Sequence, residues 1–474
     1  MSVPPLTHFI GGVFEPGQGD ALQSSNPGRR GEILTEGAEA SSEQVAKAVN
    51  AARRAQGEWS KKTGMARAQF LYRWADAITK DSGEIARAIA QEVGKPIDEA
   101  TGEVARAAFI LRYYAGQATA PEGEVIPSQV EGAIQYTIRE PLGLVGLITP
   151  WNFPLAIPIW KMAPALAFGN TVVLKGSELS PLCSQWIAQT ALQALLPEGV
   201  INVLSGRGAT VGAALVGEEI DGLSFTGSAA TGRLLAVDSA QRNRKFQAEM
   251  GGKNVAIVLQ PADVPLAAKL VASGAFRYAG QKCTATSRCL VESNLWDSFV
   301  NELKNEMNAL PIADPLQPGG AIGPVIRQEV VDQIHAITKN AEILHQVPVP
   351  AGLEGFYLPA VAVEEADPDH ELHQKELFAP VLTLTRVKNI NEALDYANHS
   401  EFGLSASLFT QNLSYATYYT RKIKAGMVRV NADTTGVDPC APFGGLRGSS
   451  THSPEQGTAA RLFYTDSKTV QINP

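Results

Sequence analysis

The segment Gly280-Gln281-Lys282-Cys283 places a single cysteine directly after a glycine-containing turn. Upstream, apolar residues between Leu266 and Ala275 recur at helical spacing, so Cys283 is predicted to lie just past the end of a helix. A thiol at such a junction can point into a cleft, where its thiolate acts as a nucleophile. The alternative is a small buried apolar side chain, the commoner role of a single cysteine. The segment alone does not decide between the two.

Two other polar residues follow predicted strands. Asn152, in Thr149-Pro150-Trp151-Asn152-Phe153-Pro154, comes after an apolar run, and its amide could donate to a developing oxyanion. Glu249 precedes a pair of glycines and could act as a general base for water if burial raises its pKa. Each has a structural alternative, because Asn152 could stabilise a turn between prolines and Glu249 could be a surface acid.

Several loops contain residue types that bind nucleotides. Lys175 and Glu178 follow a strand at a spacing that suits ribose hydroxyls, although an ordinary solvated ion pair would look the same. The segment Phe225-Thr226-Gly227-Ser228 follows a strand and opens a helix, whose free N–H groups favour a pyrophosphate. It is not a P-loop, and the glycines at 206, 208 and 212 form only an incomplete dinucleotide fingerprint. The loops at 376–380 and 442–449 are bounded by proline, and each could be purely structural.

The composition excludes several classes of protein. The chain has 474 residues, of which 45% are hydrophobic, and this length predicts two or three domains. A net charge of −8 without any basic run argues against a nucleic-acid partner. No apolar run is long enough for a transmembrane helix, and Met1 to Pro5 lacks the features of a signal peptide. We therefore expect a soluble, cytoplasmic protein.

Metal binding and disulfides are not expected either. The four cysteines, Cys183, Cys283, Cys289 and Cys440, are too dispersed for a disulfide framework or a zinc site. The one close histidine pair, His370 with His373, lies in an acidic loop and is predicted to decorate the surface rather than to bind a metal.

Alternating strands and helices are predicted to position these residues. In the first part of the chain, Ser41 and Gln44 form a capping-box pattern, and helical patterns fill residues 64–117. Between 144 and 258 the strand candidates are 144–148, 171–174, 201–204, 222–225 and 255–259, which predicts a parallel sheet with ligands at its carboxyl edge. A second series includes 285–291, 381–385, 405–409 and 427–430. The tail, 461–470, is predicted to be an edge strand that pairs with 133–139, within one subunit or across an interface.

Taken together and in this order, these segments resemble the aldehyde dehydrogenase superfamily over nearly the whole chain. The matching segments are Trp-Asn-Phe-Pro at 151–154, Lys175 with Glu178, Phe-Thr-Gly-Ser at 225–228, Glu-Met-Gly-Gly-Lys at 249–253, Gly-Gln-Lys-Cys at 280–283, Glu-Leu-Phe at 376–378 and Pro-Phe-Gly-Gly at 442–445. The resemblance implies an α/β fold with a Rossmann-type cofactor domain (1–120 and 143–249), an α/β catalytic domain (250–435) and a small β oligomerisation arm (121–142 and 436–474). A homodimer or homotetramer is expected.

The resemblance also implies the catalytic roles. Cys283 would attack the aldehyde carbonyl, and Asn152 with the Cys283 backbone N–H would hold the oxyanion of the thiohemiacetal. Hydride loss would leave a thioester, and Glu249 would activate the water that hydrolyses it. Lys161 matches a lysine thought to help relay protons.

The cofactor implied is NAD, with NADP possible. Lys175 and Glu178 would bind the adenosine ribose and Ser228 the pyrophosphate, while Glu376 would hold the nicotinamide ribose with Phe378 near the nicotinamide. Further cofactor contacts are expected from Thr149, Pro150, Trp151, Ser177, Gly208, Gly212, Phe225, Thr226, Gly227 and Gly251. The Glu178 carboxylate would repel a 2′-phosphate, which favours NAD, although Lys175 and Ser177 could accommodate that group. Gly176 departs from the family, in which proline is common at this position.

The substrate regions look most like the α-ketoglutaric semialdehyde (2,5-dioxovalerate) dehydrogenase branch. Arg277 matches an arginine that in this branch contacts the distal carboxylate of the substrate, and a structural salt bridge is its alternative. Phe153, Trp160 and Cys440 are the other expected substrate contacts. Because the pocket residues at 156 and 159 are apolar, a bulkier or aromatic aldehyde, or succinic semialdehyde, remains an alternative.

Two other classes of function are open to this chain. One is a catalytically silent scaffold on the same fold, against which Asn152, Glu249 and Cys283 argue jointly. The other is a cysteine hydrolase with a catalytic histidine, but no histidine lies in any of the matching segments.

Overall fold

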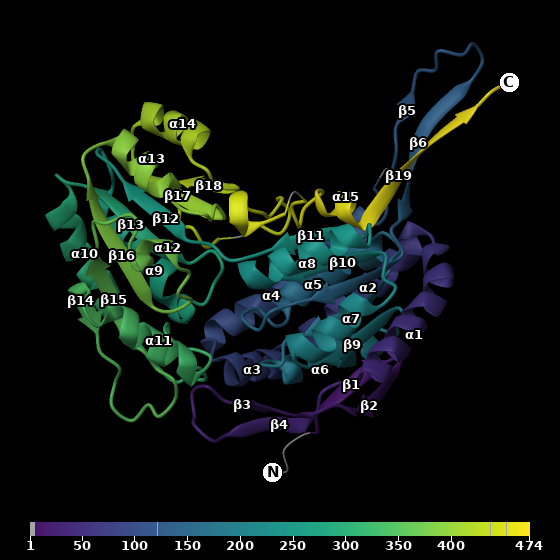
Figure 1. Ribbon diagram of the computed structural model, residues 1–474, viewed down its shortest axis with the longest axis horizontal. Helices are drawn as coiled ribbons and strands as arrows, with labels where there is room; N and C mark the ends of the chain where they lie inside the picture. The colour runs from purple at the N-terminus through teal and green to yellow at the C-terminus, as the bar shows by residue number, and fades with distance from the viewer. Residues whose placement is uncertain (1–4, 121, 437, 452) are drawn as a thin grey trace.

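A computed structural model describes residues 5–120, 122–436, 438–451 and 453–474. Met1 to Pro4, which carry most of the N-terminal segment considered for a signal peptide, lie outside the described residues, as do Pro121, Val437 and His452. Two α/β bodies lie side by side, and a thin arm that carries the C-terminus extends away from them (Figure 1). Among the described residues, no helix has the length and apolar character needed to cross a bilayer.

The first body is built on a seven-stranded sheet of order β11-β10-β7-β8-β9-β1-β2. The five strands from β11 to β9 are parallel, and β1 and β2 extend the sheet as an antiparallel hairpin. The strands are β1 (Thr7–Ile10), β2 (Val13–Pro16), β7 (Leu144–Ile148), β8 (Thr171–Gly176), β9 (Ile201–Ser205), β10 (Gly222–Thr226) and β11 (Lys245–Glu249). The strands predicted at 144–148, 171–174, 201–204 and 222–225 are confirmed, and β11 is the strand expected before Glu249, for which the sequence analysis gave no range.

The α-helices that accompany this sheet in the described residues include those predicted between 64 and 117. They are α1 (Ser42–Ser60), α2 (Gly64–Lys80), α3 (Ser82–Val93), α4 (Ile97–Gln117), α5 (Ala156–Ala167), α6 (Pro181–Gln193), α7 (Ala213–Gly217) and α8 (Ala229–Gln241). The capping box before α1 is confirmed, because the Ser41 hydroxyl accepts from the Gln44 N–H while the Gln44 side chain accepts from the Ser41 N–H.

The second body contains a seven-stranded sheet of order β14-β15-β16-β13-β12-β17-β18. Its strands are β12 (Asn254–Val258), β13 (Thr286–Glu292), β14 (Glu342–Val347), β15 (Ala360–Glu364), β16 (Val381–Val387), β17 (Ser405–Phe409) and β18 (Met427–Val430). Its helices are α9 (Val264–Phe276), α10 (Trp296–Asn308), α11 (Gln328–Thr338), α12 (Glu371–Gln374), α13 (Ile390–Asn398) and α14 (Leu413–Lys422).

One strand assignment was wrong. The segment 255–259 was predicted within the first series of strands, but β12 lies between β13 and β17 in the second sheet. An apolar run shows that a strand is buried on both faces but does not specify its neighbours, so the pattern alone could not place it, whereas the catalytic-domain range implied by the resemblance, 250–435, includes it. Strands β14 and β15 were not predicted.

The arm is a three-stranded sheet of order β19-β6-β5, from β5 (Val125–Ile126), β6 (Ile134–Pro141) and β19 (Thr465–Ile472). Strands β6 and β19 pair antiparallel along their whole length within the same chain, which confirms the predicted pairing of the tail. The first residues of the predicted tail strand instead form the short helix α15 (Ala460–Tyr464). A separate hairpin joins β3 (Ala21–Ser25) to β4 (Ile33–Ala38).

Candidate active site

The nucleophile candidate lies after a backbone turn of unusual conformation. Helix α9 ends at Phe276, and Tyr278, Ala279 and Gly280 then adopt left-handed φ values of 56°, 52° and 68°. Such a conformation costs a residue other than glycine about 1–2 kcal/mol, so surrounding contacts must hold the turn. A Cβ at Gly280 would lie 2.5 Å from the Ala379 carbonyl oxygen, so only glycine fits there. The turn leaves Cys283 half-buried, just past a helix end as predicted.

Cys283 lines a cavity of about 220 Å³. Ile157 comes from α5, and the other lining residues come from the carboxyl ends of β7, β10 and β11 with the loops that follow them and from the loop before β16; the full set is Pro150, Trp151, Asn152, Ile157, Thr226, Gly227, Ser228, Met250, Gly251, Glu376 and Phe378. Most of these were predicted site residues from separate motifs, and the fold brings them to one place. At the cavity, Trp151 and Phe378 pack edge to face with ring centroids 5.8 Å apart.

Asn152 is buried, and its side-chain amide donates to the Gln281 carbonyl at 3.1 Å, two residues before the thiol. Gln281 is itself fixed, because its side chain donates to the Pro324 carbonyl and accepts from the Ile326 N–H, each at 3.0 Å. The amide donor and the thiol are therefore held against the same short segment, as an oxyanion site requires.

The electrostatic environment of the thiol is acidic. Burial, with the carboxylates of Glu376 and Glu249, raises the pKa of Cys283 to about 12. Burial also raises the pKa of Glu376 to about 7, and its carboxylate accepts from the Gly252 N–H at 3.0 Å. At neutral pH the thiol is therefore protonated in this state, and a base or a nearby cation must favour its thiolate.

Glu249 is fully enclosed. One carboxylate oxygen accepts from the Ser450 hydroxyl, and the other is buried without a hydrogen-bond partner among the described residues. Burial, followed by the charge of Glu455, raises the pKa of Glu249 well above its usual value, while Lys161 opposes the shift. These are the conditions under which a carboxylate becomes a base near neutrality.

Lys161 connects to this acid through a buried pair. Its ammonium donates to the Ser224 hydroxyl at 2.8 Å and forms an ion pair with Glu455. Glu455 was missed by the sequence analysis. It is buried in the loop before α15, and no local pattern marks it; only its burial beside Lys161 does so.

A second group of predicted cofactor residues lies outside the cavity, along the same sheet edge. The Lys175 ammonium donates to the Gly206 carbonyl at 3.1 Å and lies 3.6 Å from the Glu178 carboxylate. Gly212 packs beside this lysine, and the space above Gly208 is open. Thr149, Ser177 and Phe225 also lie outside the cavity; the Phe225 ring packs in the core beneath Gly227.

The residues present fit a dinucleotide. Ser228 caps the N-terminus of α8, and the buried hydroxyls of Thr149 and Thr226 have no partner among the described residues. A Cβ at Gly251 would lie 2.1 Å from a Glu376 oxygen, so glycine leaves room for a ligand to approach that carboxylate. A carboxylate, a helix N-terminus and the Lys175–Glu178 pair thus follow one sheet edge, as ribose and phosphate groups require.

None of the four predicted substrate residues lines the cavity. Trp160 is buried and packs against Phe443 with ring centroids 5.5 Å apart, while Phe153 packs edge to face on Tyr278. Arg277 is half-buried, and within the described residues its guanidinium makes no hydrogen bond or ion pair. Cys440 is exposed in its loop. Cys183 and Cys289 are buried in α6 and β13, so Cys283 is the cysteine at the cavity.

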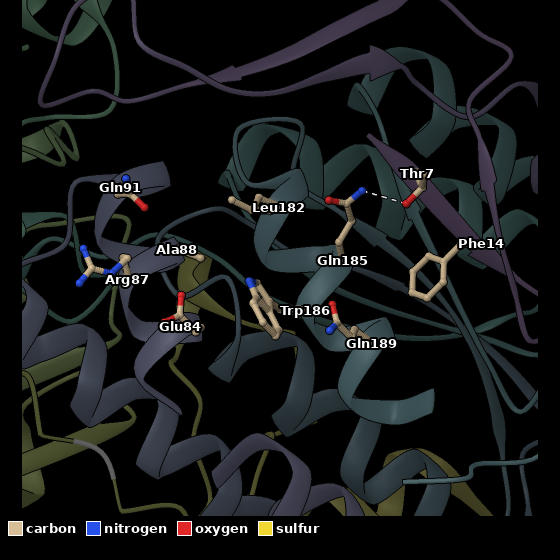
Figure 2. A pocket seen from close by; sticks show the side chains of 10 residues that line it. All are labelled: Thr7, Phe14, Glu84, Arg87, Ala88, Gln91, Leu182, Gln185, Trp186 and Gln189. Carbon is tan, nitrogen blue, oxygen red and sulfur yellow. Dashed lines mark hydrogen bonds between the residues drawn. The ribbon is translucent and has the colours of Figure 1, made fainter. Parts of the chain in front are cut away.

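A second hollow, of about 490 Å³, lies between α3, α6 and the β1–β2 hairpin (Figure 2). Trp186 and Arg87 contribute to its wall, and the Gln185 amide donates to the Thr7 hydroxyl at 2.9 Å. It contains none of the predicted site residues and no cysteine, so we assign the chemistry to the cavity at Cys283.

The histidine pair does not behave as predicted. His370 is partly exposed, but His373 is buried, where its ring contacts the Glu365 carbonyl at 3.0 Å. Burial lowers the pKa of His373 to about 4, so it is neutral. The surface prediction was wrong for His373, because α12 packs its ring against β16, where it lies 3.3 Å from the Thr385 hydroxyl. No group of three metal-ligating side chains occurs in the part of the chain that the structure describes.

Known proteins of one family resemble this chain over nearly its whole length. Residues 14–470 match the model of the Aldehyde dehydrogenase family. The chain is similar to the alpha-ketoglutaric semialdehyde dehydrogenase of Bacillus subtilis (41% identity, 98% of each sequence) and to the mitochondrial benzaldehyde dehydrogenase of Antirrhinum majus (36%, 98% of this chain and 88% of that protein). The solved structure of an NAD-dependent aldehyde dehydrogenase from Sinorhizobium meliloti matches with a TM-score of 0.95 and 33% identity, covering 99% of this chain and 95% of that one. The resemblance and the fold class predicted from the motifs are confirmed.

The acidic environment predicts a change in thiol reactivity. At about pH 8.5 Glu376 is largely ionised, and Glu376→Gln removes its charge while keeping an acceptor for the Gly252 N–H. The pKa of Cys283 should fall, so iodoacetamide should alkylate Cys283 at least about threefold faster, measured by mass spectrometry of its peptide. Glu178→Gln, which removes a carboxylate paired with Lys175, is the matched control and should leave the rate unchanged. A slower reaction in Glu376→Gln would contradict the assignment.

Proposed function

The chain belongs to the aldehyde dehydrogenase family and catalyses the NAD-dependent oxidation of an aldehyde, and from this premise we propose that its substrate is an acidic semialdehyde such as α-ketoglutaric semialdehyde. The observation that carries the proposal is Arg277. Its half-buried guanidinium, six residues before Cys283, makes no hydrogen bond or ion pair within the described residues. An arginine without an internal partner can bind a carboxylate through two parallel hydrogen bonds. The Bacillus subtilis relative, whose name specifies that semialdehyde, supports the same class of substrate.

We propose that the Cys283 sulfur attacks the aldehyde carbon while the thiol proton leaves to a base. The resulting thiohemiacetal oxyanion would accept hydrogen bonds from the Asn152 amide and the Cys283 backbone N–H. NAD, when bound, accepts the hydride that the substrate carbon loses. The substrate is then held on Cys283 as a thioester. Its reacting carbon has been oxidised from the level of an aldehyde to that of a carboxylic acid.

Hydrolysis of the thioester needs a base for water, and Glu249 is the candidate. Its pKa is raised by burial, so its ionised form can take a proton near neutral pH. Glu249 takes a proton from the water as the water oxygen bonds to the thioester carbon, the carbon–sulfur bond breaks to release the carboxylic acid, and that proton returns to the Cys283 sulfur. Lys161 pairs with Glu455 and donates a hydrogen bond to Ser224. These buried polar groups would relay protons from the region of Glu249.

We propose for the three parts of the chain the roles that the family implies. Residues 1–120 and 143–249 would bind NAD, 250–435 would carry the nucleophile, and 121–142 with 436–474 would form the oligomerisation arm. The arm supports a homodimer or homotetramer, because its strand β19 has a free edge and its residues Val125, Ile134 and Ile472 are 84%, 59% and 53% exposed. The four unpaired cysteines are consistent with a reducing cytoplasmic location.

The charges around Glu249 predict opposite shifts in the pH dependence of turnover. Lys161→Met removes the cation that lowers the pKa of Glu249, so the rise of kcat with pH should move to higher pH. Glu455→Gln removes a carboxylate that raises this pKa, so the rise should move to lower pH. Each shift should be at least about half a pH unit, measured as steady-state kcat under saturating substrate. Shifts in the same direction for both variants would contradict the assignment of Glu249 as the base.

The substrate proposal predicts a selective loss in Arg277→Ala. For α-ketoglutaric and succinic semialdehydes, kcat/KM should fall about thirtyfold or more, since a lost buried charge pair costs ~2 kcal/mol. Values for propanal and benzaldehyde should change less than about threefold, because these substrates have no carboxylate. The measurement is NADH formation with each aldehyde in turn.

Two controls accompany this panel. Arg327→Ala removes an exposed arginine paired with Glu329 and should leave every substrate unchanged, and Cys283→Ala should abolish oxidation of them all. If benzaldehyde is the best substrate and Arg277→Ala is neutral throughout, the acidic assignment is wrong and aldehyde oxidation still stands. An aromatic or bulkier aldehyde would then be the substrate class to assign.

The exposed arm predicts a dependence of assembly on its apolar residues. Ile134 and Ile472 are directly paired across β6 and β19, and Ile134→Lys combined with Ile472→Lys should shift the protein toward a single-chain mass in light scattering. Leu413→Lys changes a residue that is 80% exposed on α14, away from the arm, and should leave the assembly intact. Wild type that is already a single chain at micromolar concentration would contradict the proposal.

A further inference from the structure

Two carboxylates near the start of α4, Glu99 and Glu103, have no role in the mechanism above. They are four residues apart, so they lie on the same face of the helix. The Glu99 carboxylate pairs with the Lys282 ammonium at 2.8 Å, on the residue directly before the nucleophile. One Glu103 oxygen accepts the backbone N–H groups of Leu155 and Ala156, each at 3.0 Å, where α5 begins after Asn152. One face of α4 is therefore bonded both to the turn that leads to Cys283 (the nucleophile turn) and to the loop that carries Asn152 and leads into α5.

Lys95 lies at the centre of this arrangement. It is completely buried, and its ammonium pairs with the second oxygen of Glu103. The same ammonium lies 3.7 Å from the centroid of the Phe153 ring and 4.6 Å from that of Tyr278. A buried charge is tolerated only when it is paired, and here one carboxylate and the faces of two rings surround it.

The two rings belong to the two segments that have to be aligned. Phe153 directly follows Asn152, and Tyr278 is the first residue of the left-handed run that leads to Cys283. The rings pack edge to face at 6.3 Å, and the Tyr278 hydroxyl donates to the Val93 carbonyl at 3.4 Å, next to the Gly94-Lys95 segment. A left-handed run of this kind persists only where its surroundings hold it, and Lys95 is a central part of those surroundings.

We propose that Lys95 is a positioning residue for the oxidation step: by clamping Phe153 against Tyr278 and pairing with Glu103, it fixes the Asn152 amide relative to the Cys283 sulfur. Lys95 touches neither of the groups proposed to react, so it acts through the two segments that carry them. A displacement of about 1 Å between reacting groups can cost about a hundredfold in rate, which sets the scale of the effect. The inference rests on the roles proposed above for Asn152 and Cys283.

A double-mutant cycle tests the inference. Lys95→Met, which keeps the length of the side chain and removes its charge, should lower kcat/KM for the best aldehyde between about tenfold and about a hundredfold. In an Asn152→Ala background the same change should cost less than about threefold, because the amide that Lys95 helps to align is gone. The Kd for NAD, measured by quenching of intrinsic fluorescence, should change less than about twofold in both backgrounds.

Glu103→Gln provides a second variant if Lys95→Met does not fold. It keeps a carbonyl acceptor for the N–H groups at the start of α5 and removes the charge that pairs with Lys95, so it should show the same dependence on Asn152. The matched control is Arg67→Met, since the buried Arg67 guanidinium bonds the opposite end of α5 through the Ala167 carbonyl at 2.8 Å. This control should lower thermal stability while leaving kcat/KM within about twofold.

The outcomes separate this inference from the proposed function. An equal loss from Lys95→Met in the presence and absence of Asn152 would overturn the positioning role, as would unchanged kcat/KM in a folded Lys95→Met protein. Full activity in Cys283→Ala or Asn152→Ala would instead overturn the proposed catalytic roles, whatever Lys95 does.

Discussion

The site depends on a very short crossing between the two α/β bodies. Strand β11 ends at Glu249 in the first sheet, and β12 begins at Asn254 in the second, so only 250–253 connect them. Two glycines make the crossing possible, because a Cβ at Gly252 would lie 2.9 Å from the Cys283 carbonyl oxygen and one at Gly251 would meet Glu376. The crossing therefore passes directly between the nucleophile turn and the Glu376 carboxylate and keeps both at the end of the first sheet.

Asn254 fixes this junction from the other side. Its amide donates to the carbonyls of Cys283 and Ala285 at 2.8 and 2.9 Å, and its oxygen accepts from the Ser405 N–H. The start of β12 is thus bonded to the nucleophile turn on one side and to β17 on the other. This buried network is fully satisfied at Asn254, and such networks favour one arrangement over alternatives.

Burial gives the chemical groups of the site their character. Burial raises the pKa values of Cys283, Glu249 and Glu376 alike, because each of these groups is less stable as an anion away from bulk water. For a carboxylate this shift is useful, since it moves a weak base toward the pH at which water must be deprotonated. For the thiol it is a cost, and only a cation or a base brought close to the sulfur can offset it. The burial that makes Glu249 a better base thus makes the nucleophile dependent on its neighbours.

The sequence by itself determined which local segments carry chemistry and in what order they occur. Asn152 after β7, Glu249 before two glycines and Cys283 after a helix were all recognisable, because strand ends, glycine turns and caps are set by residues a few positions apart. The ordered motifs also predicted the family and the fold, and the pairing of β6 with β19 followed from alternating polarity.

Only the tertiary structure decided which distant groups complete the site. Lys161 and Glu455 meet although they are 294 residues apart, and Lys95 reaches Phe153 and Tyr278 from a loop between two helices. Neither Glu455 nor Lys95 has a local signal, since a buried charge looks like a surface charge until its partner is placed beside it. The alternation pattern assigned β12 to the wrong sheet, and His373 was wrongly predicted at the surface, for the same reason. Local patterns specify the elements, but burial and charge pairing are properties of the packed chain.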